Sequence, residues 1–135
     1  MTTILRPDHF TIVTDDLAVT KEFYENMLGF TSGLRPEFKF PGLWLYANEK
    51  AILHVIKVDK MPNPRKGALD HMAFRGEDIN ALLRQLKSAG LEYRLKRTPH
   101  PWEQWQVFFK DPNGVDVEID FDGQEVLDSE HSEDN

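Results

Sequence analysis

Residues 8–17 read DHFTIVTDDL, and residues 70–79, which lie 62 positions further on, read DHMAFRGEDI. Both stretches begin with an Asp-His pair, continue with the β-branched or alternating residues of a strand, and have as their last residue but one an aspartate that can cap a helix. Each also leads to a later strand with a further ligand-type side chain, His54 in the first case and Glu118 in the second. We interpret the chain as two copies of one unit. The imidazole and carboxylate groups at equivalent positions form a candidate metal site: His9, His54, His71 and Glu118.

Each copy is expected to fold in the order strand, helix and three further strands, written βαβββ. Gly29 and Gly90 follow the two helices, where a glycine readily adopts the left-handed backbone of a helix stop. The stretch MPNPRKG at residues 61–67 contains two prolines and is the expected linker. The expected elements, in chain order, are 9–14, the helix 17–28, a strand around Phe38, 43–47, 51–58, 69–75, the helix 78–89, 92–96, 104–109 and 115–121.

These elements predict an α+β fold in which two tandem βαβββ modules form a curved mixed sheet around a metal cleft. We expect a single domain over residues 1–121, with module one at about 5–60 and module two at about 68–121. Residues 122–135 hold six acidic residues and no Lys or Arg, so they are expected to form a solvated, mobile tail. The net charge of −7 therefore belongs largely to the tail.

The composition limits the classes of partner and location. A chain of 135 residues with 40% hydrophobic residues can bury a packed core. It has no run of about 20 apolar residues and no basic cluster, so neither a membrane nor a nucleic acid is an expected partner. It also has no cysteine, which excludes disulfides and thiolate metal sites. Together with the absence of a signal-peptide pattern, this favours a cytoplasmic location.

Strand alternation predicts which side chains can meet. It places His54 on the face opposite Leu53 and Val55, and Glu118 on the face opposite Val117. If the apolar faces pack beneath the helices, the four ligand candidates face a shared cleft. Two ordinary readings stay open at this point: a strand histidine is usually a hydrogen-bonded structural residue, and Glu118 could face water beside other acids.

Further motifs add to the Asp-His pairs: FYENMLGF at residues 23–30 ends the first helix, and DPNG at residues 111–114 leads into the strand with Glu118. With these motifs the chain resembles the vicinal oxygen chelate superfamily over roughly residues 5–121. That superfamily includes glyoxalase I, fosfomycin-resistance thiol transferases, type I extradiol dioxygenases, methylmalonyl-CoA epimerase and bleomycin-sequestering proteins. The motifs identify the superfamily better than they identify a reaction.

The resemblance implies a ligand set. His9, His71 and Glu118 fall on three positions from which the superfamily takes its metal ligands, and His54 falls on the fourth, where glyoxalase I usually has Glu. His54 is then either a fourth ligand or a residue that contacts the substrate beside the metal. Glu118 and His54 are the implied catalytic residues, with Glu118 able to serve as a base. The implied cofactor is a divalent transition metal: Fe, Mn, Ni, Co or Zn.

The implied function is that of a metal-dependent isomerase or lyase acting on a small substrate chelated through vicinal oxygens. The alternatives are an extradiol-type dioxygenase, a thiol transferase of the fosfomycin-resistance type, and a non-catalytic small-molecule binding protein. The intact ligand set argues against pure sequestration. A homodimer is expected, with a metal site formed in one chain or shared across two.

Three further features have both a functional and a structural reading. His100 precedes Glu118 in a region where extradiol enzymes place an acid-base histidine, a weak parallel. Arg75 could hold an anionic substrate or pair with a nearby acid. Four aromatic residues of the first copy could form an apolar substrate wall or belong to the core: Phe38, Phe40, Trp44 and Tyr46.

Overall fold

The structure is a computed structural model that describes residues 1–133. The chain divides into two compact units, Met1–Pro62 and Asn63–Asn135, which we call module 1 and module 2. Module 1 contains β1 (Phe10–Thr14), α1 (Leu17–Leu28), β2 (Thr31–Ser32), β3 (Gly42–Ala47) and β4 (Lys50–Lys57). Module 2 contains β5 (Met72–Arg75), α2 (Ile79–Ser88), β6 (Tyr93–Arg97), β7 (Trp105–Lys110) and β8 (Asp116–Phe121).

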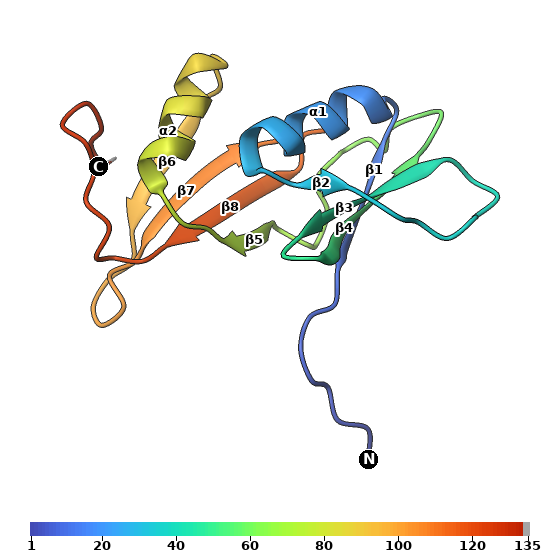
Figure 1. The fold of residues 1–135 in the computed structure, drawn as a ribbon, viewed down its shortest axis with the longest axis horizontal. Helices are drawn as coiled ribbons and strands as arrows, with labels where there is room; N and C mark the ends of the chain where they lie inside the picture. The colour runs from blue at the N-terminus through green and yellow to red at the C-terminus, as the bar shows by residue number, and fades with distance from the viewer. Residues whose placement is uncertain (134–135) are drawn as a thin grey trace. The chain divides into compact units, whose positions relative to one another are not determined.

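Each module has its own four-stranded mixed sheet (Figure 1), with the strand order β1-β4-β3-β2 in module 1 and β5-β8-β7-β6 in module 2. The first and last strands of each module run parallel, and the other neighbours are antiparallel. The α+β class and the tandem βαβββ order predicted from the sequence are thus confirmed.

α1 has the predicted bounds, and α2 begins one residue later and ends one residue earlier than predicted. The Asp16 carboxylate accepts a hydrogen bond from the Val19 amide, and Asp78 accepts one from Ala81, each at 3.1 Å. Gly29 closes α1 with φ of 69°, in the left-handed region that favours glycine. The helices therefore start within one residue of the repeated acidic positions.

The cores lie on the faces opposite the ligand candidates. Leu53 and Val55 of β4 are buried, as is Val117 of β8. In α2, the buried residues recur at helical spacing and present one apolar stripe: Ile79, Leu82, Leu83 and Leu86. In module 1, α1 contacts β2 and β3. No helix among the described residues is long and apolar enough to cross a membrane.

The strand expected around Phe38 does not form. The second strand of module 1 is instead the two-residue β2, and residues 33–41 contain no strand. Pro36 and Pro41 lie in this segment, and neither can donate a backbone hydrogen bond to a sheet. The strands at 9–14 and 69–75 also begin later than expected, because β1 starts at Phe10 and β5 at Met72.

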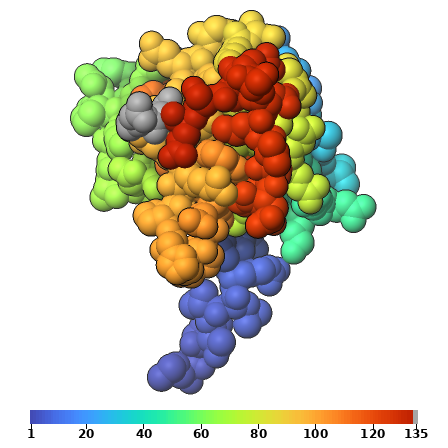
Figure 2. All heavy atoms as spheres, turned by 90° about the vertical axis from the view of Figure 1, so that its left-hand side faces the viewer, coloured from blue at the N-terminus to red at the C-terminus, as the bar shows by residue number. Residues whose placement is uncertain are grey.

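The acidic C-terminal segment also differs from expectation. The sequence predicts a solvated, mobile tail, whereas the structure places residues 122–133 along α2, on the surface of module 2 (Figure 2, red). The Glu125 carboxylate accepts hydrogen bonds from the amides of Asp78 and Ile79, at 3.2 and 2.7 Å. A charged acceptor at a helix N-terminus is stabilised by the unpaired amides there. Residues 134–135 of the predicted tail lie outside the described residues.

Candidate functional site

In module 1, His9 and His54 lie on the same face of the sheet. His9 directly precedes β1, and β1 pairs with β4 so that Thr11 faces His54. Because side chains alternate along a strand, His9 shares the face of Thr11. The two imidazole rings stack with 3.7 Å between centroids and 15° between planes. On its other side, His54 stacks on Trp44 of β3, at 3.9 Å and 10°.

The nitrogen atoms of these two histidines have different partners. His9 Nδ1 lies 2.8 Å from an Asp8 carboxylate oxygen, a contact that leaves Nε2 as the ring nitrogen available to a metal. His54 Nε2 lies 3.2 Å from the Ala51 carbonyl oxygen, to which it can donate. Burial, and next the neighbouring His9, lower the pKa of His54, so its ring is held neutral near pH 7.

The stacking bears directly on whether His54 is a ligand. A metal lies close to the plane of each imidazole that binds it, about 2.0–2.1 Å from the nitrogen. Two rings in nearly parallel planes 3.7 Å apart cannot both direct a lone pair at one ion. In this conformation His54 is therefore suited to forming a wall beside His9 rather than to joining it on the same metal.

A depression of about 730 Å³ opens over this wall in module 1, with His9, His54, Trp44 and Phe38 among its lining residues. Phe38 also stacks on Phe40, with 5.0 Å between centroids. This part of the aromatic set has the position expected of an apolar wall.

Tyr46 is not part of this wall. A register shift between Leu45 and Tyr46 interrupts the pairing of β3 with β4, and the Tyr46 hydroxyl donates to the Leu34 carbonyl. Because Leu45 pairs with Leu53 and Tyr46 with Ala51, the extra residue is Ile52 of β4, and the bond to Leu34 is what sets Tyr46 apart from Trp44.

In module 2, His71 and Glu118 approach each other directly. His71 precedes β5, and Glu118 lies in β8, opposite Ala73. His71 Nδ1 lies 2.8 Å from an Asp70 carboxylate oxygen, the same arrangement as in module 1. His71 Nε2 lies 3.3 Å from Glu118 Oε1, and Gln106 donates to the other carboxylate oxygen at 3.3 Å. An imidazole nitrogen and a carboxylate oxygen thus converge on one point.

Both groups have shifted pKa values. Burial, and next a hydrogen bond with Asp120, raise the pKa of Glu118 to about 6. The hydrogen bond to Asp70 raises the pKa of His71. A carboxyl that is only 7% exposed and lies beside a second acid is costly to ionise unless a cation compensates it. Such perturbed groups are frequent at functional sites.

The remaining candidates have other roles. Arg75 donates to the Gln104 side chain at 2.7 Å, and within residues 1–133 it forms no ion pair with an acid. His100 is exposed in the loop between β6 and β7. Asp116, the first residue of β8, forms ion pairs with Lys66 at 3.1 Å and with Lys110 at 2.6 Å.

Gln106 and Lys66 are residues that the sequence reasoning missed. Gln106 reaches Glu118 only because of the β7–β8 register. Lys66 comes from the linker, where its charge also pairs with Asp70 at 3.2 Å. No sequence pattern marks either position.

Comparison with known proteins identifies the family of the chain. The family model described as the Glyoxalase/Bleomycin resistance protein/Dioxygenase superfamily matches residues 6–119. The chain is 27% identical over 118 residues to Glyoxylase I 4 of Arabidopsis thaliana, which is 83% of this chain and 68% of that protein.

Two solved structures have the same fold. A glyoxylase/bleomycin resistance protein/dioxygenase domain from Frankia sp. EAN1pec superposes with a TM-score of 0.73 at 16% identity, over 96% of this chain and 100% of that chain. The fosfomycin resistance protein FosX from Listeria monocytogenes superposes with a TM-score of 0.68 at 17% identity, over 90% and 94%.

Proposed function

Because the chain belongs to the Glyoxalase/Bleomycin resistance protein/Dioxygenase superfamily, we propose that it is a metal-dependent enzyme whose small substrate binds through two adjacent oxygen atoms. The observation that carries this proposal is the paired geometry of the two Asp-His units. In each, the aspartate holds Nδ1 at 2.8 Å and leaves Nε2 for a metal. A carboxylate that fixes the far nitrogen of a ligand histidine is a recurrent feature of metal sites.

The proposed ligands are His9, His71 and Glu118. The donor set fits a divalent transition metal: His71 Nε2 and Glu118 Oε1 already lie 3.3 Å apart, and Glu118 is buried without a full compensating charge. Two imidazoles and one carboxylate suit Mn, Fe, Co, Ni or Zn and leave positions open for a substrate. When bound, such a metal supplies Lewis-acid stabilisation of negative charge on the substrate oxygens.

The chain's own residues supply binding and proton transfer. With a pKa of about 6 when no metal is bound, Glu118 can take up a proton near neutral pH on leaving the metal, and Gln106 holds its second oxygen. His54, neutral and stacked on Trp44, presents a flat surface that can contact the substrate beside His9. Proton transfer by one carboxylate next to a polarised carbonyl is the chemistry of an isomerase or lyase, which is our preferred reaction class.

Two other reaction classes are candidates. Two histidines and one carboxylate also form the ligand set of non-haem iron oxygenases, which supports an extradiol-type dioxygenase as the second candidate. A thiol transferase of the fosfomycin-resistance type, which the resemblance of the sequence to the superfamily implies, is the third.

The first experiment measures the metal content of untagged protein, together with His71→Ala and Glu118→Ala variants and the control His100→Ala. We expect the control to hold one equivalent more of a transition metal than either site variant. Absence of metal, and of metal uptake from Mn, Fe, Co, Ni or Zn solutions, would refute the proposal that the chain is a metal-dependent enzyme. Lactoylglutathione formation, oxygen uptake with catechols, and thiol-dependent loss of an epoxide then separate the three reactions.

The proposed ligands come from both modules, either of one chain or of two chains in a homodimer. Mixing and refolding His9→Ala with His71→Ala protein separates the two arrangements. In a shared site, half of the dimers are mixed, and each mixed dimer regains one complete ligand set. Within one chain, no complete set is regained.

A further inference from the structure

The acidic C-terminal segment follows α2 through contacts along most of the helix. Arg84 pairs with Asp128 at 2.8 Å, and Lys87 donates to the Glu130 carbonyl at 3.0 Å. A turn follows, closed by a hydrogen bond of 2.9 Å from the His131 amide to the Asp128 carbonyl. The turn gathers side chains that the sequence separates by up to three positions.

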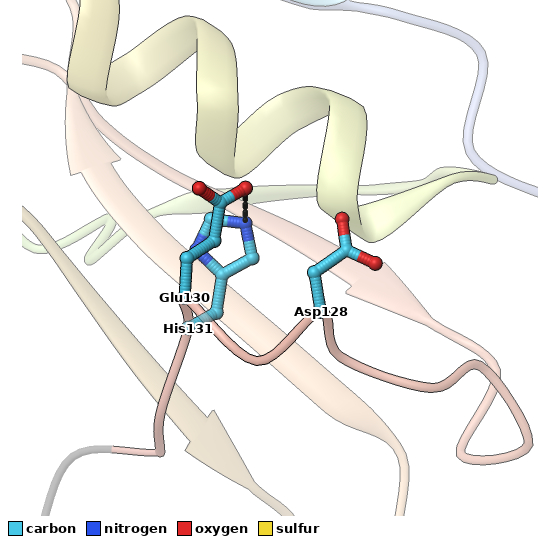
Figure 3. Close-up of side chains that lie close together, drawn as sticks. All are labelled: Asp128, Glu130 and His131. Carbon is cyan, nitrogen blue, oxygen red and sulfur yellow. Dashed lines mark ion pairs between the residues drawn. The ribbon is translucent and has the colours of Figure 1, made fainter.

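Three ligand-type side chains meet at this turn (Figure 3). Asp128, Glu130 and His131 each offer one donor atom, and these three atoms all lie within 4.8 Å of one another. His131 Nε2 lies 3.5 Å from Glu130 Oε1. The cluster lies within module 2, on a segment separate from His71 and Glu118.

The burial of His131 calls for a partner. Its side chain is 0% exposed, yet within the described residues neither ring nitrogen makes a hydrogen bond. Buried polar atoms are nearly always hydrogen-bonded, and leaving them unpaired is costly. A metal bound to the imidazole nitrogen would satisfy the atom that faces the two carboxylates.

We propose that Asp128, Glu130 and His131 form a second divalent-metal site, which closes the turn at residues 128–131 of the C-terminal segment. The site lies outside the proposed catalytic centre and does not depend on it. One imidazole and two carboxylates suit Zn, Co, Ni or Mn better than Mg or Ca, which prefer oxygen ligands alone.

The geometry requires only a small closure. Donor atoms around a tetrahedral ion at about 2.1 Å stand roughly 3.4 Å apart, so separations of up to 4.8 Å contract by about 1.4 Å or less with side-chain rotation. Arg84 occupies one carboxylate oxygen of Asp128 and leaves the other for the metal. With Arg84 and Lys87 close by, the positive charge around the turn further disfavours ions that bind through charge alone.

The test uses the full chain and Zn²⁺ as the probe. Equilibrium dialysis is performed on a His71→Ala/Glu118→Ala background, which removes the proposed catalytic centre, with circular dichroism to verify folding. We expect one equivalent of Zn²⁺ to remain on this background. Adding Glu130→Gln should weaken its affinity by at least about tenfold, whereas the control Glu133→Gln, an exposed acid of the same segment, should change it by less than about twofold.

Hydrogen exchange of residues 122–133 is the second readout, because a metal clip should slow exchange there upon Zn²⁺ addition and Glu130→Gln should abolish the effect. Glu130 is half-exposed, so this variant keeps the fold even if His131→Ala does not. Absence of Zn²⁺ on the background, or equal affinity with Glu130→Gln, overturns the tail site. If the single variant Glu130→Gln loses Zn²⁺ and the single variant His71→Ala does not, the proposed catalytic metal centre is refuted and the proposed tail site is retained.

Discussion

The two modules share an Asp-His pair before the first strand and differ in the side chain that the last strand brings to it. In both, an Asp-His pair precedes the first strand, and the aspartate holds Nδ1 at 2.8 Å. In module 2 the partner on the last strand is Glu118, whose carboxylate meets His71 Nε2 at 3.3 Å. In module 1 the partner is His54, which meets His9 face to face, with 3.7 Å between ring centroids.

This difference teaches that a repeated sequence position does not ensure a repeated role. Glu118 extends a charged oxygen toward the histidine, whereas the flat, neutral ring of His54 lies between His9 and Trp44. The duplicated fold supplies two equivalent positions, and the side chain at each decides whether it binds a metal or forms a surface.

Among these predictions, removal of Glu118 should lower metal affinity the most. Glu118→Ala deletes the one charged ligand of the proposed set, so we expect metal affinity to fall by more than about 100-fold, and activity with it. Metal titration monitored by calorimetry measures the change. The control is Glu77→Ala, an exposed acid of module 2. Retention of wild-type affinity without Glu118 would remove module 2 from the metal site.

Substitution of either aspartate that is paired with a ligand histidine should have the second-largest effect on metal affinity. Asp8→Asn and Asp70→Asn weaken the hold on the ligand histidines, so each should lower metal affinity by about 10- to 100-fold. The same titration applies, with Asp59→Asn, an exposed aspartate, as the control. If only Asp70→Asn has an effect, His9 is not a ligand and the symmetry of the two Asp-His pairs is structural.

Much of the frame could be predicted from the sequence, because it depends on local patterns. Asp16 and Asp78 cap their helices, Gly29 stops α1, and alternation places Leu53 and His54 on opposite faces. These features follow from residue type and spacing, which the duplicated sequence shows twice.

The missed features depend on contacts between distant segments. Tyr46 donates to the Leu34 carbonyl instead of joining the aromatic wall, and Gln106 reaches Glu118 through the β7–β8 register. The tail appears solvated from its charge alone, yet Glu125 finds the free amides at the start of α2. Neither hydrogen bonding nor ring stacking between such segments is encoded in local composition.

The helix starts offer a comparison of stability. Asp16 and Asp78 each accept one amide, but α2 has a second cap from Glu125, which accepts two more. Glu125→Ala should therefore lower the free energy of unfolding by about 1–2 kcal/mol. Urea denaturation measures the change, and Glu133→Ala is the matched tail control. A difference below about 0.3 kcal/mol between the two variants would show that the cap contributes little.

Replacement of His54 by phenylalanine should have the smallest effect on metal affinity. It tests most directly whether His54 has a stacking role or is a metal ligand. His54→Phe keeps a flat ring between His9 and Trp44 and deletes both nitrogens, so a stacking role predicts that metal affinity changes by less than about threefold. His54→Ala removes the ring as well, and we expect it to raise KM through loss of the wall while metal stays bound. Loss of metal in both variants would instead make His54 a ligand, and would mean that metal binding turns the ring out of the stack.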